Sequence, residues 1–280
     1  MENKRNYRIV ASDLDGTFLT TTQMVSRENM LAVEKMAELG VQFVPTTGRT
    51  LGEIPEELTS SPAVRYIITS DGAAVWDKKA QEMIITRYFS RELVNFVLDT
   101  ANSCTSYVLS HEGGKNYYDT QKHNGAHLSR CRVIDYFRTI IEKSAFPLDN
   151  YDGTIRASDK VEMFCMFFGS DEELSRCKKI FLDTGKLSVS QSSPYNLEVY
   201  VSSAGKGNTL RAFAERLGVD ISDVIAVGDS NNDRELVRAA GLGLAMENAS
   251  DELKAVADKT ICSCDEHAAK YILENFIISR

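Results

Sequence analysis

Two aspartates near the start of the chain have the type and spacing that could hold a cation or share a proton. Residues 7–12 include Ile and Val and precede the segment Asp-Leu-Asp-Gly-Thr at 13–17, which predicts a short buried strand that ends in a turn. Side chains two residues apart on a strand point to the same face, so Asp13 and Asp15 can reach one small volume. Two carboxylates that close repel each other unless a cation or a shared proton compensates. A plain strand-to-turn junction is the alternative, because Asp and Gly are common in turns.

Further polar segments follow other predicted strands. The strand-like run 41–46 leads into Thr47-Gly48-Arg49, and the run 223–227 leads into Gly-Asp-Ser-Asn-Asn-Asp at 228–233. Strands that alternate with helices, such as the predicted helices at 26–39, 51–58 and 208–217, indicate a parallel sheet covered by helices. Ligands bind such sheets outside the carboxyl ends of the strands. We therefore expect Asp13, Thr47 and Asp229 to converge on one crevice.

Together with Ala-Gly-Lys-Gly at 204–207, these segments resemble the four motifs of the haloacid dehalogenase (HAD) superfamily. The resemblance is closest to its Cof-like phosphatase branch, which carries a large C2-type cap. The pattern there is Asp-x-Asp-Gly-Thr, Thr-Gly-Arg, Lys-Gly and Gly-Asp-x-x-Asn-Asp, and all four occur here in that order. The resemblance implies an α/β fold, in which 1–83 and 194–280 form a Rossmann-like parallel-sheet core and 84–193 form an inserted α+β cap domain.

The pattern of the middle segment agrees with such an insertion. Helical patterns cover 90–100, 121–143 and 171–184, and strand-like runs cover 105–110 and 161–168. Pro194 and the serines beside it suit a hinge back to the core.

The resemblance also implies catalytic and metal-binding roles. Asp13 would be the nucleophile and form an aspartyl-phosphate, a known covalent strategy for carboxylates. Asp15 would be the general acid for the leaving oxygen and then the base for water. Asp13, the backbone carbonyl of Asp15 and the Asp229 carboxylate would hold Mg²⁺, which prefers hard oxygen ligands.

Other residues are candidates for binding the substrate phosphate. Thr47 and Gly48 offer a hydroxyl and free amides before a predicted helix, which form an anion site, although Thr47 could simply cap that helix. Lys206 is a candidate for neutralising the charge of the phosphate. The other interpretation, a P-loop lysine, fails because Gly207 follows it where a P-loop needs Ser or Thr. By resemblance, Asn232 contacts the phosphate and Asp233 supports Lys206 or the metal shell.

Two other positions have a role that the sequence leaves open. Arg49 could touch substrate or pair with Glu53 four residues later. Asp71 stands in Asp-Gly-Ala, where relatives usually show Asn-Gly-Ala.

The resemblance predicts a Mg²⁺-dependent phosphatase for a small phosphorylated metabolite, such as a sugar phosphate or a cofactor phosphate. One alternative is a phosphotransferase or mutase of the phosphomannomutase type, in which a sugar oxygen replaces water. Another is a non-catalytic phosphate-sensing module. The presence of both Asp13 and Asp15 argues against that module, since binding alone needs no acid beside the nucleophile.

Composition limits the partners. The chain has 32 Lys and Arg against 40 Asp and Glu, a net charge of −8, which argues against nucleic acid or an anionic membrane as partner. No apolar run approaches the roughly 18 residues of a membrane span, and the first six residues lack the apolar core of a signal peptide. We therefore expect a cytoplasmic protein whose six cysteines are reduced thiols.

His123 and His127 are four residues apart and could lie on one face of a helix as metal ligands.

Overall fold

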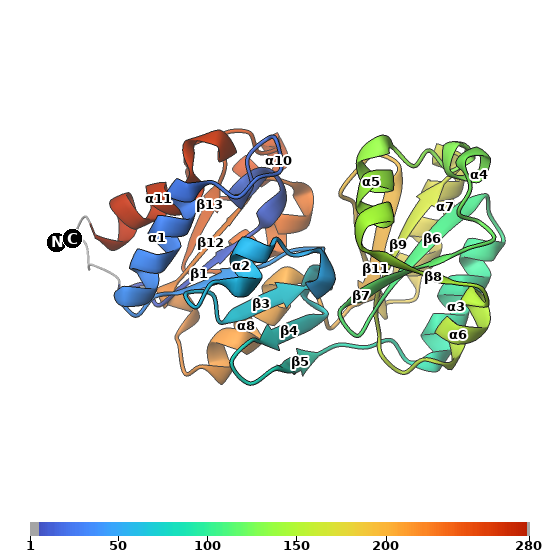
Figure 1. Ribbon diagram of the computed structural model, residues 1–280, viewed down its shortest axis with the longest axis horizontal. Helices are drawn as coiled ribbons and strands as arrows, with labels where there is room; N and C mark the ends of the chain where they lie inside the picture. The colour runs from blue at the N-terminus through green and yellow to red at the C-terminus, as the bar shows by residue number, and fades with distance from the viewer. Residues whose placement is uncertain (1–5, 279–280) are drawn as a thin grey trace. The chain divides into compact units, whose positions relative to one another are not determined.

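The computed structural model describes residues 6–278, which group into two compact units. The first unit takes the chain up to Gly48, Ile54–Ile85, and the chain from Gly205 onward. The second unit takes Arg49–Glu53 and Thr86–Ala204. Figure 1 shows both units, each with a sheet and helices of its own. The expectation for the first six residues falls almost entirely on residues 1–5, which lie outside the described residues.

The first unit is built on a parallel sheet with the strand order β14-β13-β12-β1-β2. Its strands are β1 (Ile9–Ser12), β2 (Gln42–Pro45), β12 (Val224–Gly228), β13 (Leu242–Ala245) and β14 (Lys259–Thr260). Ile9 pairs with Gln42 on one side and with Val224 on the other. The first strand thus lies between strands from opposite ends of the chain, and its carboxyl end is the place where both ends of the chain can contribute side chains.

An antiparallel sheet extends the first unit. It consists of β3 (Tyr66–Thr69), β4 (Ala74–Asp77) and β5 (Glu82–Thr86). A parallel bridge between Thr46 and Ile68 joins it to the end of β2.

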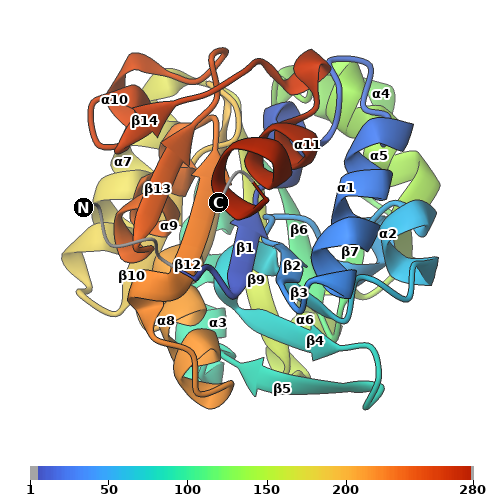
Figure 2. The same ribbon diagram turned by 90° about the vertical axis from the view of Figure 1, so that its left-hand side faces the viewer.

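Helices cover the sheet of the first unit (Figure 2). They are α1 (Arg27–Glu38), α2 (Glu56–Ser60), α8 (Lys206–Arg216), α9 (Arg234–Ala239), α10 (Asp251–Lys254) and α11 (Ala268–Ile272). The side chain of Ser26 accepts a hydrogen bond from the Asn29 N–H and caps α1. Helices α1 and α11 pack together, as do α8 and α9. Phe213 of α8 belongs to a buried apolar cluster with Ile9 and Val224.

Short turns complete the first unit. Single 3₁₀ turns occur at Ser70–Gly72, Ile221–Asp223, Asn231–Asp233 and Cys264–Glu266, and wider turns at Leu14–Phe18 and Leu273–Ile277.

The second unit is a six-stranded sheet with the order β10-β11-β9-β6-β7-β8, antiparallel except between β7 and β8. Its strands are β6 (Ser106–Glu112), β7 (Lys115–Asp119), β8 (Ala145–Leu148), β9 (Val161–Phe168), β10 (Leu187–Ser190) and β11 (Asn196–Val201). Its helices are α3 (Arg91–Asn102), α4 (Gly125–Arg130), α5 (Asp135–Ser144), α6 (Tyr151–Ala157) and α7 (Asp171–Asp183), and a 3₁₀ turn occupies Leu51–Glu53. Leu128 and Ile141 bury Tyr107 on one face of this sheet. Helices α3 and α7 pack together, with the Phe96 and Phe181 rings 6.3 Å apart.

Three expected boundaries differ from the structure. The helix expected over 51–58 is a 3₁₀ turn followed by α2, because Pro55 breaks the helical run. The helix expected over 121–143 is two helices, α4 and α5, separated at Arg132, which has a positive φ of 57°. Residues 196–201 were expected in the core, but β11 pairs with β9 and β10 in the second unit. Pro194 lies in the turn between β10 and β11 and marks no hinge at that point.

The predicted fold class is confirmed. A parallel sheet with helices forms one unit, and a second unit with its own mainly antiparallel sheet is inserted into the chain. Among residues 6–278, no helix has both the length and the apolar character that a membrane crossing requires.

Candidate active site

The site lies at the carboxyl end of β1, where Asp13 is almost completely buried. Only 5% of Asp13 is exposed, and its N–H donates to the Val227 carbonyl of β12 at 3.0 Å. The chain then turns at Gly16, which has a φ of 73°. A Cβ atom added to Gly16 would lie 2.5 Å from an Asp229 carboxylate oxygen. The close approach of β1 and β12 at this edge therefore requires glycine at position 16.

Asp229 follows β12 and faces the turn after β1. The hydroxyl of Thr17 donates to Asp229 Oδ1 at 3.0 Å, across 212 residues of sequence. Sequence reasoning missed this contact, although Thr17 belongs to the Asp-x-Asp-Gly-Thr motif. Asp15 is half-buried and lies in the turn Leu14–Phe18, two residues after Asp13. The structure brings the two predicted strand ends together.

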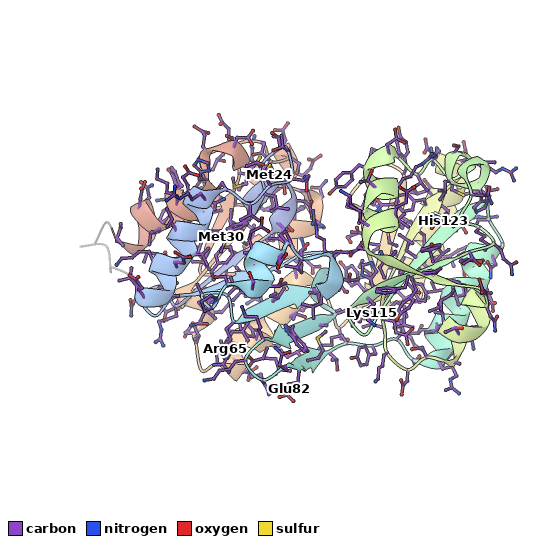
Figure 3. The ribbon with its side chains drawn as sticks, viewed as in Figure 1. Met24, Met30, Arg65, Glu82, Lys115 and His123 are labelled. Carbon is purple, nitrogen blue, oxygen red and sulfur yellow. The ribbon has the colours of Figure 1, made fainter. Side chains whose placement is uncertain are left out.

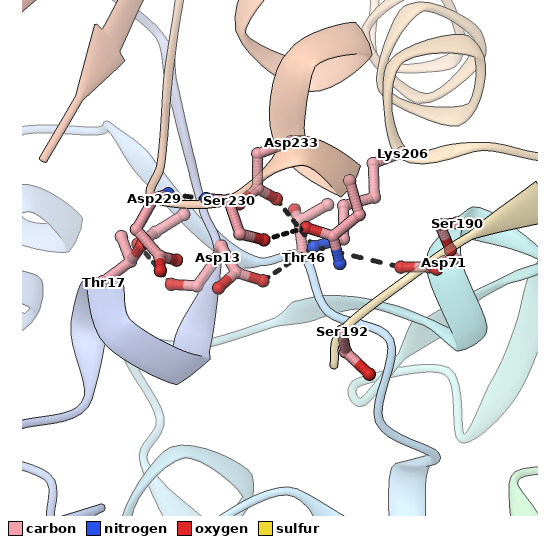
Figure 4. A network of polar contacts seen from close by, with 12 residues as sticks. Asp13, Thr17, Thr46, Asp71, Ser190, Ser192, Lys206, Asp229, Ser230 and Asp233 are labelled. Carbon is pink, nitrogen blue, oxygen red and sulfur yellow. Dashed lines mark hydrogen bonds and ion pairs between the residues drawn. The ribbon is translucent and has the colours of Figure 1, made fainter. Parts of the chain in front are cut away.

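Lys206 is the cation of the site and lies between two carboxylates (Figure 4). Its side chain is 1% exposed, and its Nζ atom donates to Asp13 Oδ1 and to Asp233 Oδ1, each at 2.7 Å. Asp71 Oδ1 lies 3.9 Å from the same nitrogen. Sequence reasoning left the role of Asp71 open, and the structure places it as a third carboxylate beside Lys206.

Backbone contacts fix the place of Lys206. It is the first residue of α8, directly after Gly205, and the Gly205 N–H donates to the Asp71 carbonyl at 3.0 Å. A Cβ atom on Gly72, which has a φ of 87°, would lie 2.5 Å from the Gly205 carbonyl oxygen. The turn after β3 and the start of α8 can approach this closely because residue 72 is glycine.

Asp233 supports Lys206 with one oxygen and the loop after β12 with the other. Its Oδ2 atom accepts the N–H groups of Asp229 and Ser230 at 3.1 and 3.2 Å. Both carboxylate oxygens therefore have protein partners. Asn232 is half-buried and accepts the Ser230 hydroxyl at 2.5 Å through its side-chain oxygen.

The backbone of Thr47 is hydrogen-bonded to β3 and to Asp71. Its N–H donates to the Ile68 carbonyl at 3.0 Å, and its carbonyl accepts the Asp71 N–H at 3.1 Å. No helix begins at Thr47 or Gly48, since the next turn starts at Leu51. An anion site at this point would therefore rest on the Thr47 hydroxyl and loop amides, without a helix terminus.

The remaining polar candidates contact other protein groups. Arg49 Nη1 donates to the backbone carbonyl of Glu53 at 3.1 Å, within the segment that groups with the second unit. His123, labelled in Figure 3, precedes α4. One of its ring nitrogens lies 2.8 Å from the Tyr107 hydroxyl, and His127 Nε2 lies 3.1 Å from the Ser106 carbonyl. The two histidines thus have separate protein partners, and no group of three metal-ligating side chains within residues 6–278 includes them.

The site carries more negative charge than its lysine can balance. Burial, followed by the charge of Asp233, raises the pKa of Asp13 well above its usual range, although Lys206 opposes the shift. Burial, with Asp233 next, raises the pKa of Asp229 to about 7. Burial alone would lower the pKa of Lys206, but Asp13, Asp233 and Asp71 raise it well above the usual value. Lys206 therefore stays charged, and the carboxylates around it favour a further cation.

The donor set fits a hard divalent cation such as Mg²⁺. Carboxylate oxygens of Asp13, Asp229 and Asp233 all lie within 4.8 Å of one another. Both oxygens of Asp233 already accept hydrogen bonds, so the carboxylates of Asp13 and Asp229 are the better metal ligands of the three. Carboxylates that supply two or so ligands, with water in the other positions, are the usual environment of Mg²⁺.

The sequence model of the haloacid dehalogenase-like hydrolases matches residues 10–273 of the chain. The chain belongs to this family. The predicted resemblance to its Cof-like branch is confirmed, and the protein is a HAD-type hydrolase.

Individual relatives agree with this HAD assignment. A 5-amino-6-(5-phospho-D-ribitylamino)uracil phosphatase of Bacillus subtilis is 28% identical over 251 residues, which cover 90% of this chain and 88% of the relative. An HMP-PP phosphatase of Yersinia pseudotuberculosis is 26% identical over 278 residues, covering 98% of this chain and 96% of the relative. The solved structure of a haloacid dehalogenase-like hydrolase from B. subtilis superposes with a TM-score of 0.83 at 23% identity, covering 96% of this chain and 100% of that one. That structure supports the fold of this HAD hydrolase.

Proposed function

We propose that this HAD hydrolase is a Mg²⁺-dependent phosphatase of small phosphorylated metabolites that works through an aspartyl-phosphate on Asp13. The observation that carries the proposal is the contact of a buried Asp13 with the Lys206 ammonium at 2.7 Å, beside Asp229 at the carboxyl end of a parallel sheet. A nucleophilic carboxylate, a fixed cation and a metal-ligand pair are the parts that phosphoryl transfer needs.

In the first step, a carboxylate oxygen of Asp13 attacks phosphorus, and the bond from phosphorus to the substrate oxygen breaks. Asp15 donates its proton to that leaving oxygen. Lys206, held by Asp233, stabilises charge on the phosphoryl oxygens, and Thr47, Gly48 and Asn232 bind them. Mg²⁺ on Asp13, the Asp15 carbonyl and Asp229 would add positive charge against the same oxygens.

In the second step, Asp15 takes a proton from water, the water oxygen attacks phosphorus, and the bond to Asp13 breaks. Phosphate leaves and Asp13 regains its carboxylate.

In this proposal the first unit is the catalytic core, and the second unit is the cap domain that determines which leaving groups the enzyme accepts. Two of the relatives are named as phosphatases of a phosphorylated ribitylamino-uracil and of HMP-PP, which supports small phosphorylated metabolites as substrates.

A phosphate-release assay on a panel of sugar and cofactor phosphates tests the proposal. We expect release with Mg²⁺ alone, none in excess EDTA, and a loss of at least about 100-fold in kcat for Asp13→Asn, because the variant lacks the nucleophile. Asp183→Asn, which changes a carboxylate that is 61% exposed on α7, is the matched control and keeps full activity.

Other outcomes would support the alternatives. A strict requirement for a sugar bisphosphate would indicate a mutase, and phosphate binding without turnover on any ester would indicate a sensing module. Either result contradicts the proposed hydrolysis.

A further inference from the structure

Two cysteine thiols meet in the second unit, whereas every residue proposed for catalysis belongs to the first unit. Cys104 follows the end of α3, and Cys177 lies in the middle of α7. Their sulfur atoms are 3.2 Å apart, across 73 residues of sequence, and both thiols are free. The sequence gives no sign of this pair, because cysteines this far apart carry no spacing motif.

The backbone around Cys104 is attached to the segment that carries Cys177. The Gly169 N–H donates to the Thr105 carbonyl at 2.9 Å, and the Thr105 N–H donates to Glu173 Oε1 at 2.8 Å. Glu173 lies in the first turn of α7, one turn before Cys177. The residue after Cys104 is therefore held to the start of α7, so the two sulfur atoms meet without a movement of either helix.

The two thiols differ in access and in charged neighbours. Cys177 is completely buried, whereas Cys104 is partly exposed. Arg176 Nη2 lies 3.1 Å from the Cys104 sulfur, and its positive charge favours the approach of an anionic reagent. Burial and the contact with Cys104 raise the pKa of Cys177 to about 12. Cys104 is thus the sulfur that a reagent from solvent can reach first.

We propose that Cys104 and Cys177 form a reversible disulfide when the protein meets an anionic low-molecular-weight disulfide such as oxidised glutathione. The thiolate of Cys104 attacks one glutathione sulfur, the glutathione S–S bond breaks, and one glutathione thiolate leaves and takes up a proton. Cys177 then gives up its proton, its sulfur attacks the Cys104 sulfur, and the second glutathione leaves as a thiol. In sum, two protein thiols are oxidised and one glutathione disulfide is reduced to two thiols.

The test is incubation of the full-length protein with oxidised glutathione, acid quenching, alkylation in denaturant and peptide mapping by mass spectrometry. We expect one cross-linked peptide that joins Cys104 to Cys177, an intact mass lowered by two hydrogens, and alkylation of the other cysteines. Dithiothreitol should restore both thiols. Oxidation should also raise the melting temperature by several degrees, because the link closes a long loop between α3 and α7.

Two variants keep the result interpretable. Cys104→Ser changes the partly exposed member and should abolish the cross-link without disturbing the core. Cys262→Ser removes another partly exposed thiol, in the first unit, and should leave the cross-link unchanged. The proposal would be overturned by recovery of Cys104 as a stable glutathione adduct with Cys177 still alkylated, or by a cross-link that forms between Cys262 and Cys264 instead.

Discussion

Asp229 has to be ionised to bind a cation, in a place where burial favours its neutral form. Its pKa is raised to about 7, first by burial and next by Asp233. A carboxyl whose pKa is higher in the folded than in the unfolded protein reduces stability once the pH exceeds its unfolded value, and the full reduction is reached above the folded pKa. The ionised site thus lowers the stability of the metal-free fold.

We therefore predict that Asp229→Asn stabilises the metal-free protein while it abolishes turnover. In EDTA at pH 8 the gain should be at least about 1 kcal/mol, since each unit of pKa shift corresponds to about 1.4 kcal/mol. The gain should shrink as the pH falls from 7 toward 4, where the folded wild type already holds the proton. Thermal denaturation at pH 5 and pH 8 measures both effects. Equal stability of the two proteins at pH 8 would contradict the argument.

In the proposed reaction, Lys206 would act on the phosphoryl group, which every substrate shares. Under the proposed function, Lys206→Ala removes charge stabilisation from the phosphoryl oxygens and should lower kcat/KM by a similar factor for all substrates, on the order of 10²–10³. A panel with one bulky and one minimal phosphate ester measures the factor. Lys35→Ala, which removes an exposed lysine paired with Glu38, is the control and should change nothing. A reordering of the panel by Lys206→Ala would place Lys206 in substrate selection.

Motif residues could be predicted from the sequence, and their non-motif neighbours could not. Asp13, Lys206 and Asp229 belong to segments whose types and order are typical of the family, and the contacts in the structure bring them together. The place of Asp71 beside Lys206 depends on a turn at Gly72 that packs against residue 205. Contacts of this kind depend on tertiary packing, which local sequence patterns do not specify.

At the scale of elements, an ion pair closes the hairpin of β3 and β4. Arg65 precedes β3 and donates to both oxygens of Asp77, the last residue of β4, at 3.1 and 2.8 Å. The N–H groups of Lys79 and Ala80 donate to the same carboxylate. The hydrogen bond from Arg65 is the main cause that lowers the pKa of Asp77 below its usual value of 3.8.

We predict that Asp77→Asn costs about 1 kcal/mol of stability at pH 7, because Arg65 is partly exposed and solvent screens the pair. A lowered carboxyl pKa stabilises the fold above the unfolded value, and this contribution is lost as the pH falls through the folded value. The difference from wild type should therefore start to shrink at the unfolded pKa of about 4 and disappear only when the pH is below the lower pKa of the folded protein. Urea unfolding at pH 7 and pH 3 measures it. Glu82→Gln, which changes an exposed carboxylate on β5, is the control (Figure 3).

The elements themselves were predicted well where periodicity is strong, as in α1, α7 and β9. The errors fall where the break between two elements is short. Residues 131–134 interrupt the run 121–143, and the turn with Pro194 resembles a hinge but joins two strands of one hairpin. A strand pattern does not say which sheet receives it, so β11 was assigned to the wrong unit.

At the scale of the molecule, the order of the strands differs from the order of the chain. The second unit is almost continuous, whereas β1 of the first unit has β2 as one neighbour and β12, more than 200 residues later, as the other. During synthesis β1 therefore has one open edge until residue 228 has left the ribosome. Open strand edges favour aggregation.

This arrangement predicts an order of folding on the ribosome. Stalled chains in which residues up to 215 are exposed should contain a protease-resistant second unit, while the segments of the first unit are still digested. Chains exposed to residue 260 should protect both units. Protection of residues 9–45 in the shorter chains would contradict this order. Before β12 is exposed, the nascent protein would contain a folded second unit and an incomplete first-unit sheet. Chaperones that cover strand edges would then have their main binding site at β1.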